Sequence, residues 1–372
     1  MILEKFARAH RPVYDHFGCA STPTGGRNAL WMAHGLARSR STANASRRRD
    51  RPGDGRTSRS PGHLSIRPVI QPVAMVNDAQ YVLAELAWMR AESIWPNGRR
   101  YLWTDAFDVV LLVSLHSESG ERQYLDQAER VVADVERVQG RSRGIRIGEA
   151  PDRDGQYFHY LAMCLYTLYI LGRHLPEYRR KGVALVRQIH DAFVVPNRGV
   201  ICKMSEDLTR PYPGTGFGAL DAFDGYVVYR LLGEQSLSRE IADMRRLIDR
   251  SAPELVITED LGLGMMLWMT HFFPEEDWAK TQKERCLGML DRMWMQEGYF
   301  CREPDVPRVK FAFTNYGVAI GLQAINANPE RVERLNVFVE SYRSGDEYDR
   351  EAITHVMACS SHFPGHLIHG FG

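Results

Sequence analysis

The chain has 372 residues, 44% of them hydrophobic, which is enough to bury a large core. Its 47 basic and 46 acidic residues nearly cancel, so the net charge favours neither nucleic acid nor an anionic membrane as a partner. No apolar run approaches the ~20 residues that span a bilayer, and the N-terminus lacks the compact apolar region of a secretory signal, so we expect a cytoplasmic protein.

The first 75 residues differ in composition from the rest of the chain. They are rich in Arg and poor in acidic residues, and residues 39–60 contain almost no large apolar side chain. Such a segment buries too little surface to offset its chain entropy, so we expect a disordered extension over 1–75 and a single folded domain over 76–372. An Arg- and Ser-rich start is also typical of organelle transit peptides, and a mispredicted gene start would look the same.

From Asp78 onward the sequence alternates between apolar and amphipathic helical segments. Asp78 is placed to cap a first helix over 79–93, whose apolar side chains form one stripe. The apolar helices are then expected over 106–115, 157–171, 223–232, 261–273, 316–327 and 355–361. The amphipathic helices are expected over 122–138, 176–193, 236–250, 274–294 and 329–342. Two Gly-containing stretches, 144–148 and 199–204, are expected to form short strands.

The number and spacing of these segments indicate a closed ring. The apolar helices start about 50 residues apart, the length of two helices with their loops, and a regular period of this size indicates a repeat architecture. The last apolar helix lacks a following partner and the helix at 79–93 lacks a preceding one, so packing the first helix beside the last would satisfy both. We therefore predict an all-α fold, an (α/α)6 toroid with short strands in its rim loops, in which the inner helices start on one rim.

Polar and aromatic residues accompany the starts of the apolar helices. In the segment 154–160, Asp154, Gln156 and His159 crowd one turn, and a His beside a carboxyl group could serve as a tuned acid or base. Paired carboxyl groups are also what glycoside hydrolysis requires. Each residue has a structural explanation as well, because an Asp, Thr or Asn before a helix is an ordinary N-cap, and aromatic residues fill cores.

The ring, with acidic residues before inner helices at Asp105, Asp154, Asp221 and Asp224, resembles the six-hairpin glycosidase superfamily over about residues 78–372. The unsaturated uronyl hydrolases of that superfamily use Asp residues at inner-helix starts. The resemblance of this chain to those hydrolases implies that Asp105 and Asp154 are the candidate general acid and base.

The same ring occurs with other functions. The N-acylglucosamine 2-epimerases share it and use a His pair, which would correspond here to His159 and His355. Non-catalytic toroids that bind a saccharide or a protein share it too, so the fold alone does not establish an activity.

We therefore expect a carbohydrate-active enzyme, a glycoside hydrolase acting on a small saccharide that could carry a uronic acid, with an epimerase or a binding toroid as alternatives. The candidate catalytic residues are Asp105, Asp154, His159, Asp221 and Asp224. The candidate substrate-binding residues are Trp103, Gln156, Tyr157, Lys203, Arg210, Asn315, Tyr316 and His355. Lys203 and Arg210 could bind a carboxylate or phosphate, and a second polar loop at 343–349 could close the site.

Other kinds of site find little support in the sequence. The six cysteines are scattered without a C-x-x-C pair, a usage typical of free thiols in a reducing compartment. His362, His366 and His369 are spaced like metal ligands, but they lack partner ligands in a recognised pattern. The sequence lacks a Walker loop, a dinucleotide fingerprint, a G-x-S-x-G elbow and an H-E-x-x-H motif. We expect neither a metal nor a cofactor.

Overall fold

The computed structural model describes residues 78–233, 235–295, 300, 312–341 and 350–368 of the chain. These residues belong to one compact unit. They form twelve α-helices, α2 to α13, a short 3₁₀ turn and four strands of two residues each, so the prediction of an all-α fold is confirmed. The extension expected over 1–75 and the polar loop expected over 343–349 lie outside the described residues.

Apolar and amphipathic helices alternate along the chain, as the sequence predicts. The apolar helices are α3 (Leu102–Ser119), α5 (Phe158–Leu171), α7 (Asp221–Gly233), α9 (Asp260–Thr270), α11 (Ala312–Ala324) and α13 (Ala352–His362). Every residue of α5 and of α9 is buried, as expected for helices that pack on all sides. The amphipathic helices are α2 (Ala79–Ala91), α4 (Arg122–Gln139), α6 (Pro176–Phe193), α8 (Ser238–Ser251), α10 (Asp277–Met295) and α12 (Pro329–Ser341).

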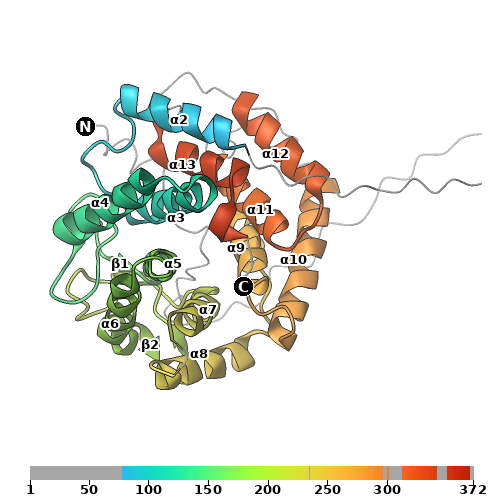
Figure 1. Ribbon diagram of the computed structural model, residues 1–372. Coiled ribbons are helices and arrows are strands. Elements are labelled where there is room, and N and C mark those ends of the chain that lie inside the picture. The colour runs from blue at the N-terminus through green and yellow to red at the C-terminus, as the bar shows by residue number, and fades with distance from the viewer. Residues whose placement is uncertain (1–77, 234, 296–299, 301–311, 342–349, 369–372) are drawn as a thin grey trace, which may run out of the picture. The chain divides into compact units, whose positions relative to one another are not determined.

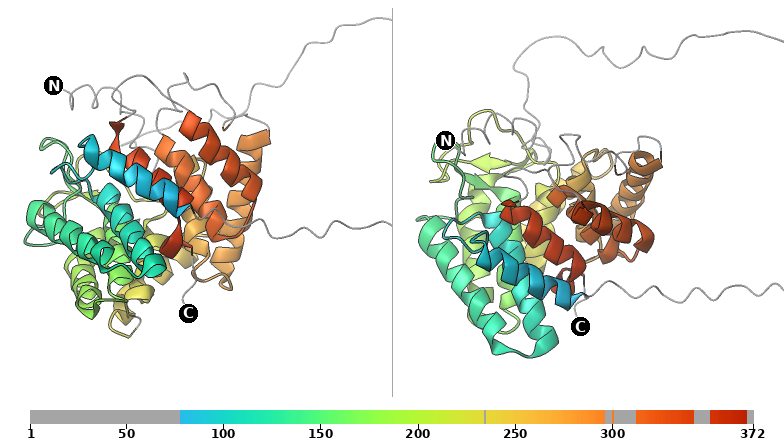
Figure 2. Two further views of the ribbon diagram at one scale, coloured as in Figure 1. Left: turned by 45° about the horizontal axis from the view of Figure 1, so that its top comes forward. Right: turned by 90° about the horizontal axis from the view of Figure 1, so that it is seen from above.

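The apolar helices contact one another in chain order. Each apolar helix packs against the next, from α3 through α5, α7, α9 and α11 to α13, and α13 also packs against α3 (Figure 1). Each amphipathic helix from α4 to α12 packs against the apolar helix that precedes it. Helix α2, drawn in blue, packs against α13 (Figure 2). The prediction that the first helix lies beside the last is therefore confirmed.

The helix starts differ in detail from the prediction. Asp78 caps α2 as expected, because its side chain accepts a hydrogen bond from the backbone N–H of Tyr81 at 2.8 Å. Helix α3 starts at Leu102, in the segment around Trp103 that was expected to begin it but slightly before the start expected near Asp105, and Tyr101 precedes it. Asp105 therefore lies within the first turn of α3 and is not its N-cap residue.

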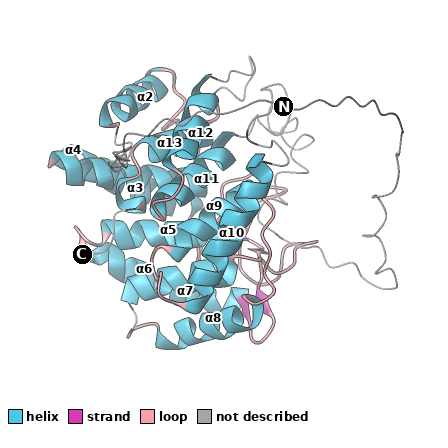
Figure 3. Ribbon diagram, turned by 90° about the vertical axis from the view of Figure 1, so that its right-hand side faces the viewer, coloured by secondary structure: helices cyan, strands magenta, loops and turns pink. Residues whose placement is uncertain are grey.

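Two antiparallel pairs of short strands lie at one end of the helices (Figure 3). β1 (Gln156–Tyr157) pairs with β4 (Lys203–Met204), so that Tyr157 lies opposite Lys203. β2 (Val194–Val195) pairs with β3 (Gly199–Val200). The strands expected over 199–204 are confirmed, whereas the stretch 144–148 contributes an isolated bridge at Ile145 and no strand. The β1–β4 pair matters for the site, since it holds the start of α5 against the loop between α6 and α7.

The last described turn, η5 (Gly365–Leu367), ties three apolar helices together at their C-terminal ends. The backbone N–H of His366 donates to Ser114 Oγ of α3 at 2.9 Å. The Tyr166 hydroxyl of α5 donates to the His366 carbonyl oxygen at 2.5 Å, and Trp268 Nε1 of α9 donates to the Leu367 carbonyl oxygen at 2.8 Å. The strands lie at the opposite, N-terminal ends of these helices, and the polar candidate residues lie there too.

Helices α9 and α11 approach closely because glycines meet at their crossing. A Cβ atom on Gly264 would lie 2.3 Å from the carbonyl oxygen of Gly317, and a Cβ atom on Gly321 would lie 2.2 Å from the carbonyl oxygen of Gly264. Any side chain at these positions would force the two backbones apart. This crossing therefore sets the spacing of the two helices.

The cysteines and the helix lengths complete the description. Cys164, Cys286 and Cys359 are buried free thiols, as expected. Cys202 is disulfide-bonded, so the expectation of a free thiol is wrong at that position. Among the described residues, none of the helices combines the length and the apolar character that a bilayer crossing requires.

Candidate functional site

The starts of α5 and α7 bring three titratable side chains together. The backbone N–H of Phe158 donates to the Cys202 carbonyl oxygen at 3.0 Å, and this bond fixes the start of α5 beside the β4 loop. His159 is the second residue of α5. Asp221 and Asp224 both lie in the first turn of α7, where a spacing of three residues puts them on one face. Since α5 packs against α7, the imidazole and both carboxyl groups meet.

His159, Asp221 and Asp224 form a compact buried group. One nitrogen of the imidazole and one oxygen of each carboxyl group lie within 4.8 Å of one another. The residues are 7%, 3% and 7% exposed. A Cβ atom on Gly218 would lie 2.1 Å from Oδ2 of Asp221, so only glycine leaves room there for this carboxyl group. We refer to these three residues as the His–Asp group.

Burial changes the protonation of the His–Asp group. It raises the pKa of Asp224 to about 8, and it raises the pKa of Asp221 well above its ordinary value, helped by the neighbouring charge of Asp224. It lowers the pKa of His159 to about 3. Burial therefore favours the neutral form of all three side chains. Oδ2 of Asp221 is buried and has no hydrogen-bond partner among the described residues.

Aromatic rings pack behind the His–Asp group. The ring of Trp103 lies 5.1 Å from that of His159 and 5.4 Å from that of Tyr160, measured between centroids. The hydroxyl groups of Tyr160 and Tyr101 are 2.7 Å apart, within hydrogen-bond distance. Trp103 is fully buried. It thus supports the imidazole in this conformation and presents no open face to a sugar.

A second polar group lies beside the first. Lys203 Nζ lies 3.3 Å from Oε2 of Glu149, 4.7 Å from the centroid of the Tyr157 ring and 4.2 Å from that of Tyr212. Burial and the charges of nearby groups, including Glu149 and Asp221, raise the pKa of Tyr157. Tyr157 therefore contacts Lys203 and lies within electrostatic range of Asp221.

Glu149 is a residue that the sequence reasoning missed. Its Oε2 contacts Lys203, while its Oε1 is buried without a hydrogen-bond partner in the described part of the chain. The sequence offered one indication of its role: Glu149 directly follows the stretch 144–148, which leads to the segment 154–160. Glu149 therefore adds a carboxylate next to those predicted.

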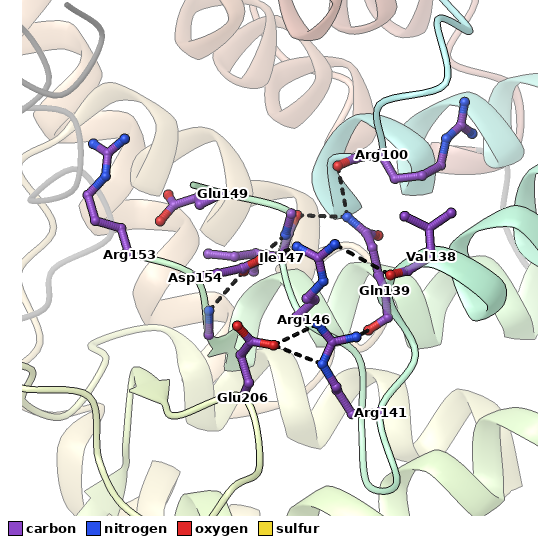
Figure 4. Close-up of polar contacts among 12 residues, drawn as sticks. Arg100, Val138, Gln139, Arg141, Arg146, Ile147, Glu149, Arg153, Asp154 and Glu206 are labelled. Carbon is purple, nitrogen blue, oxygen red and sulfur yellow. Dashed lines mark hydrogen bonds and ion pairs between the residues drawn. The ribbon is translucent and has the colours of Figure 1, made fainter. Parts of the chain in front are cut away.

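Two predicted catalytic carboxylates are held by arginines. Asp105 accepts from Arg100 at 2.9 Å and from the backbone N–H of Tyr101 at 3.1 Å. Burial raises the pKa of Asp105 more than the charge of Arg100 lowers it. Asp154 pairs with Arg146 and accepts from the backbone N–H groups of Gly148 and Gly155 at 3.2 and 2.8 Å (Figure 4). Both carboxyl groups are therefore already bound by nearby basic side chains and backbone N–H groups.

The predicted substrate-binding residues have differing surroundings. Gln156 is fully buried and fixes its loops: its Oε1 accepts from the backbone N–H of Ile145 at 2.9 Å, and its Nε2 donates to the carbonyl oxygens of Arg143 and Glu206 at 2.9 and 2.7 Å. Arg210 is exposed. These two side chains are therefore not part of the His–Asp group.

The remaining predicted residues lie at the starts of α11 and α13. Asn315 and Tyr316 are buried, and Oδ1 of Asn315 has no hydrogen-bond partner among the described residues. His355 Nδ1 lies 2.6 Å from Oε1 of Glu85, on α2. The group that gathers around His159 is thus Asp221 and Asp224, and the known contacts of His355 lie toward the amphipathic helix.

A cavity of about 390 Å³ lies apart from the His–Asp group, between α2, α3 and α4. Arg90, Arg100 and Asp108 are among the residues that line it. Burial raises the pKa of Asp108 to about 6, even though the charges of both arginines lower it. Because this cavity holds charges of both signs, it selects no ligand class.

Comparison with known proteins adds no further guidance. No family model matches the chain, and no curated protein or solved structure matches it.

Proposed function

We propose that the described helices form an (α/α)6 toroid. In support, the apolar helices contact one another in chain order, and α13 returns to contact both α3 and α2. The η5 turn also contacts three of the six apolar helices at their C-terminal ends. In this arrangement the N-termini of the apolar helices surround one opening, and the positive ends of their dipoles favour carboxylates there.

We further propose that the protein is a glycoside hydrolase acting on a small saccharide. The observation that carries this proposal is the His–Asp group, where two carboxyl groups from α7 lie close to an imidazole from α5. Hydrolysis of a glycosidic bond uses a pair of carboxyl groups, one as proton donor and the other as base or nucleophile. We assign these roles to Asp221 and Asp224, because arginines already hold Asp105 and Asp154.

The spacing of the pair favours one of the two hydrolytic routes. Retaining glycosidases keep their carboxyl groups about 5 Å apart, while inverting ones leave about 6.5–9.5 Å for a water molecule. The oxygens of Asp221 and Asp224 lie within 4.8 Å of each other. This upper limit is shorter than the inverting geometry requires. Of the two routes, the pair therefore favours the retaining one, in which one carboxylate attacks the anomeric carbon and the other carboxyl group protonates the leaving oxygen. Localisation in the cytoplasm stays a prediction from the sequence.

The test is an assay of turnover with saturated and unsaturated oligosaccharides, in which the release of reducing ends is measured. We expect Asp221→Asn and Asp224→Asn each to lower kcat by at least about a hundredfold, since each removes a group that acts in the transition state. Asp108→Asn is the matched control, because Asp108 is a buried carboxyl group on α3 outside the His–Asp group. Circular dichroism checks that each variant folds. Wild-type turnover in both Asp221→Asn and Asp224→Asn would refute the assignment.

A further inference from the structure

The His–Asp group combines nitrogen and oxygen donors from two helices. The donor atoms of its three residues all lie within 4.8 Å of one another. We propose that His159, Asp221 and Asp224 form a binding site for one divalent transition-metal ion. The inference uses the residues of the function proposed above in a different state, because a carboxylate that coordinates an ion cannot also donate a proton to a leaving oxygen. It rests on the placement of the three side chains and is independent of the substrate.

The charges around the group leave a place for a cation. Two carboxyl groups lie side by side in a buried site, where ionising both would place two negative charges next to each other. Within the described part of the chain, no ion pair joins Asp221 or Asp224 to a basic side chain. A divalent ion would supply the missing positive charge and let both carboxylates stay ionised.

An unsatisfied atom points to the same conclusion. Oδ2 of Asp221 is buried and has no hydrogen-bond partner among the described residues. A buried carboxylate oxygen without a partner is costly, and native structures normally satisfy such atoms. Coordination of an ion by this oxygen would satisfy it. The buried carboxyl group of Asp260, at the start of α9, differs, since Thr314 donates to it at 2.6 Å.

The donor set favours certain metals. Ca²⁺ and Mg²⁺ prefer sites built entirely from oxygen, and the group contains no thiolate for a soft ion such as Cu⁺. One imidazole and two carboxylates suit Zn²⁺, Mn²⁺, Fe²⁺ or Co²⁺. Three protein ligands leave at least one coordination position for a water molecule or a sugar hydroxyl.

A competing place for metals has to be removed before the test. The rings of His116 and His174 lie 5.1 Å apart, and those of His174 and His366 lie 6.3 Å apart. His174 is exposed, and the other two are half-buried. Such histidines bind added metals weakly, so the experiment uses the full-length chain carrying His174→Ala, a substitution on the protein surface.

The experiment measures metal content directly. The His174→Ala protein is stripped with a chelator, incubated with Zn²⁺, Mn²⁺ or Co²⁺ and passed through a desalting column. We expect about one bound ion per chain by mass spectrometry of the metal, and a visible absorption band with Co²⁺. Adding Asp224→Asn should weaken binding by at least about tenfold. Adding Asp108→Asn should leave the stoichiometry and the affinity unchanged.

The outcomes separate folding, metal binding and catalysis. Asn has nearly the shape of Asp, and it removes one of two repelling carboxyl groups, so we expect the Asp224→Asn protein to fold. Absence of bound metal in the parent, or equal affinity in the parent and in Asp224→Asn, would overturn the metal site. Because the metal measurement contains no saccharide, a failure to detect hydrolysis does not affect it. Hydrolysis by the stripped protein would support the proposed function and would not count as evidence for the metal site.

Discussion

At the scale of single residues, burial decides how the charged side chains behave. Asp105 and Arg100 form a buried ion pair at 2.9 Å, with both side chains almost completely excluded from solvent. Bringing such a pair out of water costs about as much as its mutual attraction returns, so the pair itself adds little stability. Replacing only one of the two residues is destabilising, because the remaining charge then lies in the core without a partner.

Arg100→Met should therefore lower the free energy of unfolding by about 3 kcal/mol at pH 7. The double variant Arg100→Met with Asp105→Leu should recover most of that loss, since it removes both charges and keeps the volume. Urea denaturation of the wild type, the single variant and the double variant measures both values. A double variant that is less stable than Arg100→Met would show that the ion pair contributes net stability.

Asp108 allows a test of pH dependence. Its pKa is raised from 3.8 to about 6, so the folded protein holds this proton more tightly than the unfolded chain does. Stability from this group is complete below about pH 4 and is lost as the pH rises through about 6. Asp108→Asn cannot lose a proton, so it should match the wild type near pH 4 and exceed it by about 1–3 kcal/mol above pH 7.

The measurement is the melting temperature of both proteins between pH 4 and pH 8. Asp126→Asn is the control, because Asp126 is a half-exposed surface carboxylate paired with Arg122. Its difference from the wild type should stay within about 0.5 kcal/mol over this range. An Asp108→Asn protein that becomes relatively less stable as the pH rises would contradict the sign of the pKa shift.

At the scale of elements, the crossing of α9 and α11 depends on glycine. A methyl group on Gly321 would meet the carbonyl oxygen of Gly264 at 2.2 Å, and a backbone atom in a helix cannot move aside cheaply. We expect Gly321→Ala to lower the free energy of unfolding by about 1–3 kcal/mol, although alanine favours a helix.

Gly288 supplies the matched control for this prediction. It lies in α10 and has no neighbouring atom within 4 Å of an added Cβ. Gly288→Ala should therefore raise the stability by about 0.5–1 kcal/mol, the intrinsic helix preference of alanine. Opposite signs for the two substitutions in one denaturation series support close packing of α9 on α11. Stabilisation by both would contradict it.

The order and type of the helices were the features that the sequence predicted best. The alternation of apolar and amphipathic segments reflects how much of each helix is buried, and this depends on local residue spacing. Helix starts were predicted less well: α3 begins at Leu102, because Leu102 and Trp103 are as compatible with a helix as the residues after them. The contacts of the site could not be predicted locally, since His159 and Asp221 are far apart in sequence. Nor does sequence spacing reveal that arginines hold Asp105 and Asp154.

At the scale of the whole molecule, the first and last described helices are joined by many contacts. The backbone N–H of Asp78 donates to the carbonyl oxygen of His362 at 3.0 Å, and the Tyr81 ring lies 4.1 Å from that of His362. Further along the same pair of helices, His355 contacts Glu85. This interface connects segments almost 300 residues apart, so bringing its two sides together carries a large entropy cost for the unfolded chain.

The α2–α13 interface has a consequence for biosynthesis. A ribosome adds residues from the N-terminus, so α2 emerges long before the helix that covers it. Until α13 has been released, the apolar faces of α2, α3 and α11 that it covers stay exposed to water. We therefore expect the nascent chain to bind chaperones that recognise exposed apolar surface until α13 has left the ribosome.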